Sequence, residues 1–170
     1  AVQGNIPQCR EWTEDDFHLS LGVYTGLTRE HGPTAGVDLV VWPETAVPAP
    51  LGYEPYSDAV RELQQYTKIP LLLGTVNYRQ APGATADETE RPAPPYLSFN
   101  SAMLLDAEAV VLDYYDKIHR VPFGEYVPFG RYLPWLVRWI GMGRDLTPGT
   151  EYTVFDLPKG ARAGVNICFE

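Results

Sequence analysis

The chemistry most readily available to this chain comes from a thiol, Cys168, close to the end of the sequence. It lies in a short, mostly apolar run, 165–169, and the turn-forming residues 158–160 come shortly before that run. We therefore expect a buried strand that delivers the thiol to the rim of a sheet. A thiolate is a strong nucleophile, and a nearby base or positive charge raises its population. The alternative is a buried structural thiol, because free cysteine packs as a small hydrophobic side chain.

Two residues elsewhere in the chain could serve this thiol, Glu44 and Lys117, and each follows a predicted strand, over 38–42 and 110–116. The Glu44 carboxylate could take the thiol proton as a general base. The Lys117 ammonium could hold the negative charge that develops on a carbonyl oxygen. Cys168 would then carry an acyl group as a thioester, which a second nucleophile removes. The alternatives are a loop carboxylate that caps a turn and a lysine at an exposed strand end.

The elements that would position these residues alternate between helices and strands. Helical spacing of apolar residues predicts helices over 14–30 and 55–68. A capping box of Thr13 and Asp16 opens the first helix, which we expect to close at Gly32 and Pro33. Residues 1–8 are predicted as the end of a strand that runs into a loop, with Pro7 as the stop. Further strands are predicted over 38–42, 70–77, 98–106, 110–116, 152–157 and 162–169, the last four as two hairpins.

This order of elements indicates an α/β or α+β layered domain with a mixed sheet. Ligands gather at the carboxyl edge of such sheets. Glu44, Lys117 and Cys168 all lie at predicted strand ends, so they form a candidate catalytic constellation.

Composition excludes several other classes of function. The net charge of −9 argues against a nucleic-acid partner, which would need clustered lysine and arginine. The two cysteines, Cys9 and Cys168, and the three dispersed histidines provide neither a disulfide framework nor a metal-ligand set. No stretch approaches the about 18 or more apolar residues of a membrane-spanning helix. We expect one domain over 1–170 that is truncated at both ends, because the sequence begins in a strand-like segment and stops two residues after Cys168.

Several short segments carry a resemblance to a known family. They are Gln3 to Gln8 with Trp12, Trp42 to Pro48, Asn100 with Ser101, Tyr115 to Lys117, Val121 to Pro128, and Ile167 to Glu170. In this order they resemble the nitrilase (carbon-nitrogen hydrolase) superfamily, and most closely its apolipoprotein N-acyltransferase branch. The resemblance covers nearly the whole chain except 80–95, a polar and proline-rich stretch that we expect to be a mobile surface insertion.

The resemblance implies an α/β fold, the nitrilase-like α-β-β-α sandwich with mixed sheets, here incomplete at the C-terminus. It makes Glu44, Lys117 and Cys168 a Glu-Lys-Cys triad. Supporting positions of the family are matched by Glu125, eight residues after the lysine, by Glu170, two residues after the cysteine, and by Asn100. It implies no cofactor and no metal.

The activity implied by the resemblance is transfer of a fatty acyl chain through a Cys168 thioester. The donor would be a phospholipid, and the acceptor would be the N-terminal amine of a diacylglyceryl-modified lipoprotein. The resemblance also implies a protein of the bacterial inner membrane whose catalytic domain faces the periplasm and contacts the membrane surface.

An aromatic segment, 132–142, falls where the family has a mobile, membrane-facing arm. Its apolar residues at helical spacing include Leu136 and Trp139, which we expect to face lipid, as we do Trp12. The alternative is a buried core helix.

Two other functions stay open from the sequence. A soluble nitrilase-type amidase would use the same triad to hydrolyse a small amide or nitrile. A non-catalytic, truncated domain is the alternative from another class.

Overall fold

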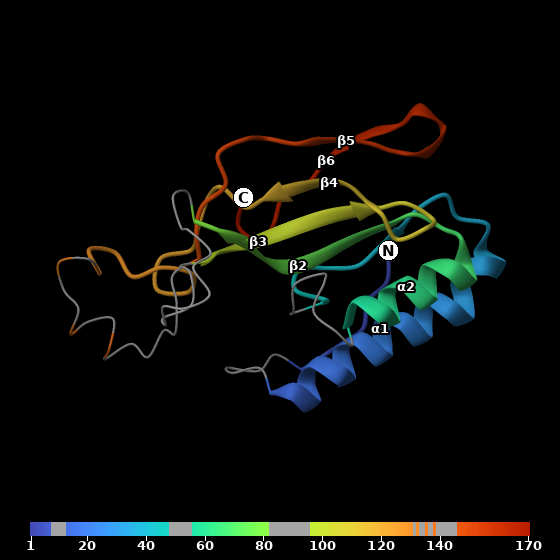
Figure 1. The fold of residues 1–170 in the computed structure, drawn as a ribbon, viewed down its shortest axis with the longest axis horizontal. Coiled ribbons are helices and arrows are strands. Elements are labelled where there is room, and N and C mark those ends of the chain that lie inside the picture. The colour runs from blue at the N-terminus through green and yellow to red at the C-terminus, as the bar shows by residue number, and fades with distance from the viewer. Residues whose placement is uncertain are drawn as a thin grey trace, which may run out of the picture.

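A computed structural model of the protein describes residues 1–7, 13–47, 56–81, 96–130, 132, 135, 138 and 146–170. These residues form three layers (Figure 1). Helices α1 (Glu14–Ala35) and α2 (Tyr56–Thr67) cover one face of a four-stranded sheet. Over the other face lies a hairpin of β5 (Val154–Asp156) and β6 (Arg162–Gly164), joined through the 3-10 turn η1 (Pro158–Gly160). The predicted α/β class is confirmed.

The sheet is mixed, with strand order β1-β2-β3-β4. β1 (Val40–Val41) runs parallel to β2 (Leu71–Gln80). β3 (Tyr96–Leu105) is antiparallel to both β2 and β4 (Val111–Asp116). The predicted β3–β4 hairpin is confirmed, and its turn is closed by Asp106, whose side chain accepts the backbone N–H groups of Glu108 and Val110 at 2.9 and 2.8 Å.

Helix α1 begins with the predicted capping box. The Asp16 N–H donates to Thr13 Oγ1 at 3.2 Å, and the Thr13 N–H donates to Asp16 Oδ2 at 2.9 Å. The predicted end at Gly32 and Pro33 was wrong, because the helix continues through Pro33 and ends at a left-handed Gly36. A proline in the last turn removes a single backbone hydrogen bond, whereas glycine provides the positive φ that the helix cap needs.

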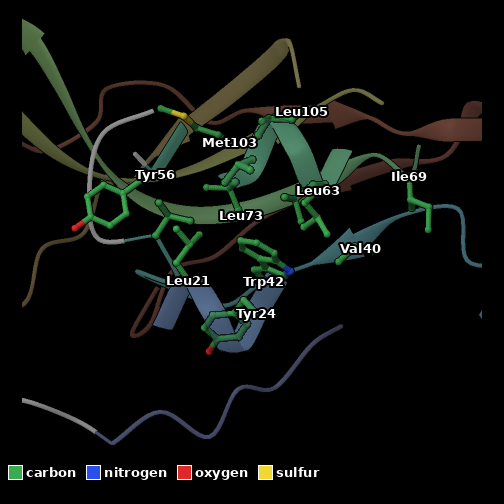
Figure 2. Packing of buried hydrophobic residues seen from close by; sticks show 14 residues of the cluster. Leu21, Tyr24, Val40, Trp42, Tyr56, Leu63, Ile69, Leu73, Met103 and Leu105 are labelled. Carbon is green, nitrogen blue, oxygen red and sulfur yellow. The ribbon is translucent and has the colours of Figure 1, made fainter. Parts of the chain in front are cut away.

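The larger core lies between the two helices and the sheet. Trp42 is its central aromatic residue and packs against Tyr24, with ring centroids 5.5 Å apart (Figure 2). Leu63 of α2 and Leu73 of β2 are fully buried there, and truncating a leucine in such a place to alanine costs about 2–5 kcal/mol. A smaller cluster lies on the opposite face of the sheet, where Leu104 and Tyr115 meet Phe155 of the hairpin.

Two strand predictions differ from the structure. Residues 1–7 form no strand, although this segment contacts β1 through the Val2 N–H, which donates to the Val41 carbonyl at 2.8 Å. The last strand ends at Gly164, so that Cys168 lies in a bend four residues later. Ile167 is buried, but Cys168 is exposed, and the backbone leaves the extended conformation at Cys168 itself, with φ +59°. The expected buried strand carrying the thiol is therefore wrong.

Candidate active site

Strand direction brings Glu44 and Lys117 to the same edge of the sheet. β4 is antiparallel to β3, which is antiparallel to β2, so β4 runs in the direction of β2 and of its parallel neighbour β1. Glu44 follows β1 and Lys117 follows β4, so both residues lie past the carboxyl ends of strands that point the same way. Glu44 and Lys117 are 73 positions apart in sequence, and they follow the two outer strands of the sheet, β1 and β4. Only the strand directions place both residues at the same end of the sheet.

Lys117 is the most enclosed charged residue of the site, with a side chain only 1% exposed. Its ammonium forms an ion pair with Glu125, with Nζ 2.8 Å from Oε1. Its backbone is fixed on both sides, because its N–H donates to the Asn100 carbonyl and its own carbonyl accepts the Gly149 N–H, each at 2.8 Å. A Cβ at Gly149 would lie 2.1 Å from the Asp116 carbonyl oxygen, so only glycine permits this approach.

Asn100 joins the two carboxylates at the edge of the sheet. Its Nδ2 donates to Glu44 Oε1 at 2.7 Å and to Glu125 Oε1 at 3.1 Å. The other Glu125 oxygen accepts the Val121 N–H at 2.9 Å, so Glu125 is held from both ends. Asn100 is buried, and its Oδ1 is one of the buried polar atoms that have no hydrogen-bond partner among the described residues. The contacts therefore form a continuous network from Glu44 through Asn100 and Glu125 to Lys117.

Glu44 itself projects from a tight turn laid across β2. The Ala46 N–H donates to the Pro43 carbonyl at 3.3 Å, and Thr45 has φ +54°. The turn lies directly over Gly74, where a Cβ would come within 2.4 Å of the Pro43 carbonyl oxygen. This isolated glycine in the apolar β2 run is a sequence signal that the prediction did not use, since such glycines mark close approaches of another backbone segment.

Cys168 enters the site from the loop after β6. It borders a cavity of about 710 Å³ that Glu44 and Glu125 also line. A second cavity of about 470 Å³, with mostly apolar walls, is also bordered by Cys168 and Glu44. Lys117 lines neither cavity and lies behind Glu125. The positive φ of Cys168 is a backbone strain of the kind found at functional sites.

Glu170 holds the loops that carry Lys117 and Cys168 together. Its Oε1 accepts the Tyr115 hydroxyl and the N–H groups of Ile118 and His119 at 2.8–3.0 Å, and its Oε2 accepts the Ile167 N–H at 3.0 Å. Burial of the carboxyl raises its pKa, but these donors outweigh burial, and the pKa of Glu170 lies below its ordinary value of 4.5. The hydrogen bonds of Glu170 therefore tie the backbone after Lys117 to the backbone before Cys168.

The structure brings most of the predicted site residues together. Glu44, Asn100, Glu125 and Lys117 are in contact, Cys168 shares a cavity with two of them, and Glu170 lies behind them. The residues expected to face lipid, Trp12, Leu136 and Trp139, lie outside the described residues. Within the described ranges no group of three or more histidine, cysteine, aspartate or glutamate side chains is arranged to hold a metal ion.

Comparison with known proteins identifies the family. The family description of carbon-nitrogen hydrolases matches residues 1–170, the whole of the sequence. This chain belongs to the carbon-nitrogen hydrolase family. The resemblance found in the sequence segments is thereby confirmed at the level of the family.

Within this family, several relatives are named apolipoprotein N-acyltransferase. That of Geobacter metallireducens is 34% identical over 170 residues, which cover 99% of this chain and 30% of the relative. That of Allorhizobium ampelinum is 31% identical over 182 residues, covering 99% of this chain and 31% of the relative. Apolipoprotein N-acyltransferase 2 of Treponema denticola is 30% identical over 180 residues, covering 94% and 30%. The chain thus spans less than a third of the length of these relatives.

Solved structures support the same fold. An amidase from Nesterenkonia sp. AN1, described with acrylamide added to its active-site cysteine, superposes with a TM-score of 0.55 at 14% identity. The match covers 89% of this chain and 52% of the amidase. The nitrilase-like α/β fold is thereby confirmed.

Proposed function

We propose that this chain is the catalytic part of an N-acyltransferase that moves a fatty acyl chain from a phospholipid to the N-terminal amine of a diacylglyceryl-modified lipoprotein. The observation that carries the proposal is the ion pair of the buried Lys117 with the partly buried Glu125, which Asn100 links to Glu44 beside the cavity that Cys168 borders. Similarity to three proteins named apolipoprotein N-acyltransferase supports this choice of reaction within the family.

In the first half of the reaction Glu44 takes the proton of the Cys168 thiol, and the sulfur attacks the ester carbonyl of the phospholipid. Negative charge develops on the carbonyl oxygen, and the positive charge of the Lys117 ammonium stabilises it. The carbon–oxygen bond to the lysophospholipid then breaks, and the leaving alkoxide takes the proton from Glu44. The product of this half is the Cys168 thioester.

In the second half the acceptor amine attacks the thioester carbonyl. Glu44 takes a proton from the attacking amine, the carbon–sulfur bond breaks, and the thiolate of Cys168 is protonated again. Glu44 can accept and return the proton in each half of the reaction, so no histidine is needed. Lys117 stays in a fixed place during both halves of the reaction, because its ammonium is paired with Glu125 and its backbone forms two hydrogen bonds.

Individual aromatic side chains that are exposed to solvent support a lipid donor. Phe123, Phe129, Tyr132, Trp135 and Phe169 are each more than half exposed, and Phe169 directly follows the candidate nucleophile. Large exposed aromatic groups are typical of interfaces with membranes or other proteins. We accordingly propose that the catalytic domain works at the membrane surface and faces the bacterial periplasm. The part of the chain that the structure describes contains no helix with both the length and the apolar character to cross a membrane.

The test is intact-mass spectrometry of the purified protein after incubation with phospholipid vesicles. We expect a fatty-acyl adduct on Cys168, and transfer of that acyl group to a synthetic diacylglyceryl-cysteine peptide added afterwards. Cys168→Ser is the matched control, since the hydroxyl keeps the shape but is far harder to deprotonate. Persistence of the adduct in Cys168→Ser would remove this residue from the role. Turnover of a small amide with water, and none with phospholipid, would favour the amidase instead. Reaction with neither substrate would favour a non-catalytic domain.

A further inference from the structure

Three buried side chains of α1 face the segment that carries Glu44. Ser20, Tyr24 and Thr28 are spaced four residues apart, so they lie on one face of the helix. All three are buried. Ser20 Oγ donates to the Ala46 carbonyl at 2.9 Å, and Thr28 Oγ1 accepts the Trp42 indole N–H at 2.9 Å.

The two hydroxyl contacts lie on either side of the catalytic carboxylate. Trp42 is two residues before Glu44 and Ala46 is two residues after it. Between them Tyr24 packs on the Trp42 ring, with the planes tilted by 32° (Figure 2). Buried polar groups that lose their partner carry a penalty of about 1–3 kcal/mol, so these contacts resist any shift of the turn.

The side chain of Glu44 is poorly fixed by its own contacts. It is exposed, and within the described part of the chain its carboxylate has one hydrogen-bond partner, the Asn100 amide. The direction in which the carboxylate points therefore depends on the backbone of the turn. That backbone includes the left-handed Thr45 and rests on Gly74, and its ends are tied to β2 by the Trp42 N–H on the Leu72 carbonyl at 2.8 Å and the Val47 N–H on the Gly74 carbonyl at 3.1 Å.

We infer that Ser20 and Thr28 are positioning residues for Glu44, and that α1 aims the general base at the Cys168 thiol by clamping the turn at both ends. This inference rests on the proposed function, because it takes Glu44 as the base that activates Cys168. Ser20 also lines the cavity that Glu44 and Cys168 border, whereas Thr28 lines no part of that cavity. Ser20 acts through the Ala46 carbonyl, and Thr28 acts through the Trp42 indole.

The experiment measures single-turnover thioester formation from phospholipid vesicles, together with the thermal midpoint, for matched variants. Thr28→Val keeps the shape and removes the acceptor of the Trp42 N–H, whereas Thr28→Ser keeps the acceptor. Ser20→Ala removes the donor to Ala46. Thr25→Val is the control on the same helix, because the Thr25 hydroxyl bonds the Leu21 carbonyl at 2.7 Å within α1 and does not reach the turn.

We expect Ser20→Ala and Thr28→Val to slow thioester formation by roughly tenfold to a hundredfold at saturating donor, since misplacing a catalytic group by about 1 Å has effects of that size. Thr28→Ser should recover most of the rate, and Thr25→Val should acylate normally. Double variants that also carry Glu44→Gln separate an effect on Glu44 from an effect on general stability. Adding Ser20→Ala or Thr28→Val to Glu44→Gln should slow thioester formation no further, although the thermal midpoint still falls.

Two results would overturn the inference. One is a lower thermal midpoint in Ser20→Ala and Thr28→Val with an unchanged acylation rate. The other is an equal slowing with and without Glu44→Gln, which would make the effect one of general stability. Normal acylation by Glu44→Gln alone would instead remove Glu44 from its proposed role, and the inference would fall with it.

Discussion

Glu125 and Glu170 are two partly buried glutamates that are held by different kinds of hydrogen-bond donors. Glu125 meets a charge and an amide, because its Oε1 lies 2.8 Å from Lys117 Nζ and 3.1 Å from Asn100 Nδ2. Glu170 meets mainly backbone, with N–H groups of Ile118, His119 and Ile167 around it and one hydroxyl. One carboxylate therefore neutralises the charge of the buried Lys117, whereas the other fixes the backbone next to Lys117 relative to the backbone next to Cys168.

Breaking the Glu125 contact should have the largest effect. Glu125→Ala leaves the buried Lys117 ammonium without its carboxylate, and loss of one partner from a buried pair costs about 3–5 kcal/mol of stability. Thioester formation should fall by about 10²–10³, the effect of losing one oxyanion donor, because Lys117 is no longer held in place. Denaturant unfolding and single-turnover mass spectrometry measure the two effects. Normal acylation in a folded Glu125→Ala protein would contradict this role.

Changing Glu170 should affect stability more than chemistry. Glu170→Gln keeps one oxygen as an acceptor but replaces the other with an amide N–H₂, which cannot accept the N–H groups bonded there. Each lost hydrogen bond to a charged acceptor lowers the free energy of unfolding by about 1.5–3 kcal/mol. We expect a lower thermal midpoint and a reduced acylation rate that recovers as temperature is lowered. An intact midpoint with lost acylation would mean that Glu170 acts on the chemistry directly, and the contrast with Glu125 would disappear.

The pH dependence of stability should distinguish Glu170 in the same way. Its pKa in the folded protein lies below the ordinary 4.5, so the unfolded chain binds the proton first as pH falls. The stabilisation is therefore complete above pH 4.5 and is lost as pH falls through the folded-state pKa. We expect the difference in unfolding free energy between wild type and Glu170→Gln to be constant above that pH and to shrink below it. A pH-independent difference would contradict the depressed pKa.

The smallest effect should come from Tyr115. Burial, followed by the hydrogen bond to Glu170 and its charge, raises the pKa of Tyr115 to about 12. Tyr115→Phe removes one hydrogen bond to the Glu170 carboxylate and should cost about 1.5–3 kcal/mol, with little change in acylation. An ultraviolet titration should show one late-ionising tyrosine that Tyr115→Phe removes. Glu170→Gln should lower the pKa of Tyr115. An unchanged tyrosine titration in Glu170→Gln would show that Glu170 does not affect the ionisation of Tyr115.

Local sequence patterns determined the elements of this protein and the residue types at their ends. The capping box of Thr13 and Asp16, the β3–β4 hairpin and the placement of Glu44 and Lys117 after strands are predictions that the structure confirms. These features depend on neighbours within a few residues, which the sequence displays directly. The triad itself, proposed from the same reading together with the family resemblance, stays a prediction for the variants above to test.

Only the tertiary structure decided how the ends of these elements meet. Cys168 lies in an exposed left-handed bend and not on the predicted strand, because Glu170 draws the loop back onto the backbone after β4. Asn100 reaches Glu44 across 56 residues of sequence, and Ser20 reaches Ala46 across 26. Gly74 and Gly149 matter only because distant carbonyl groups lie against them. Such contacts follow from strand order and packing between segments far apart in the chain, which no local periodicity encodes.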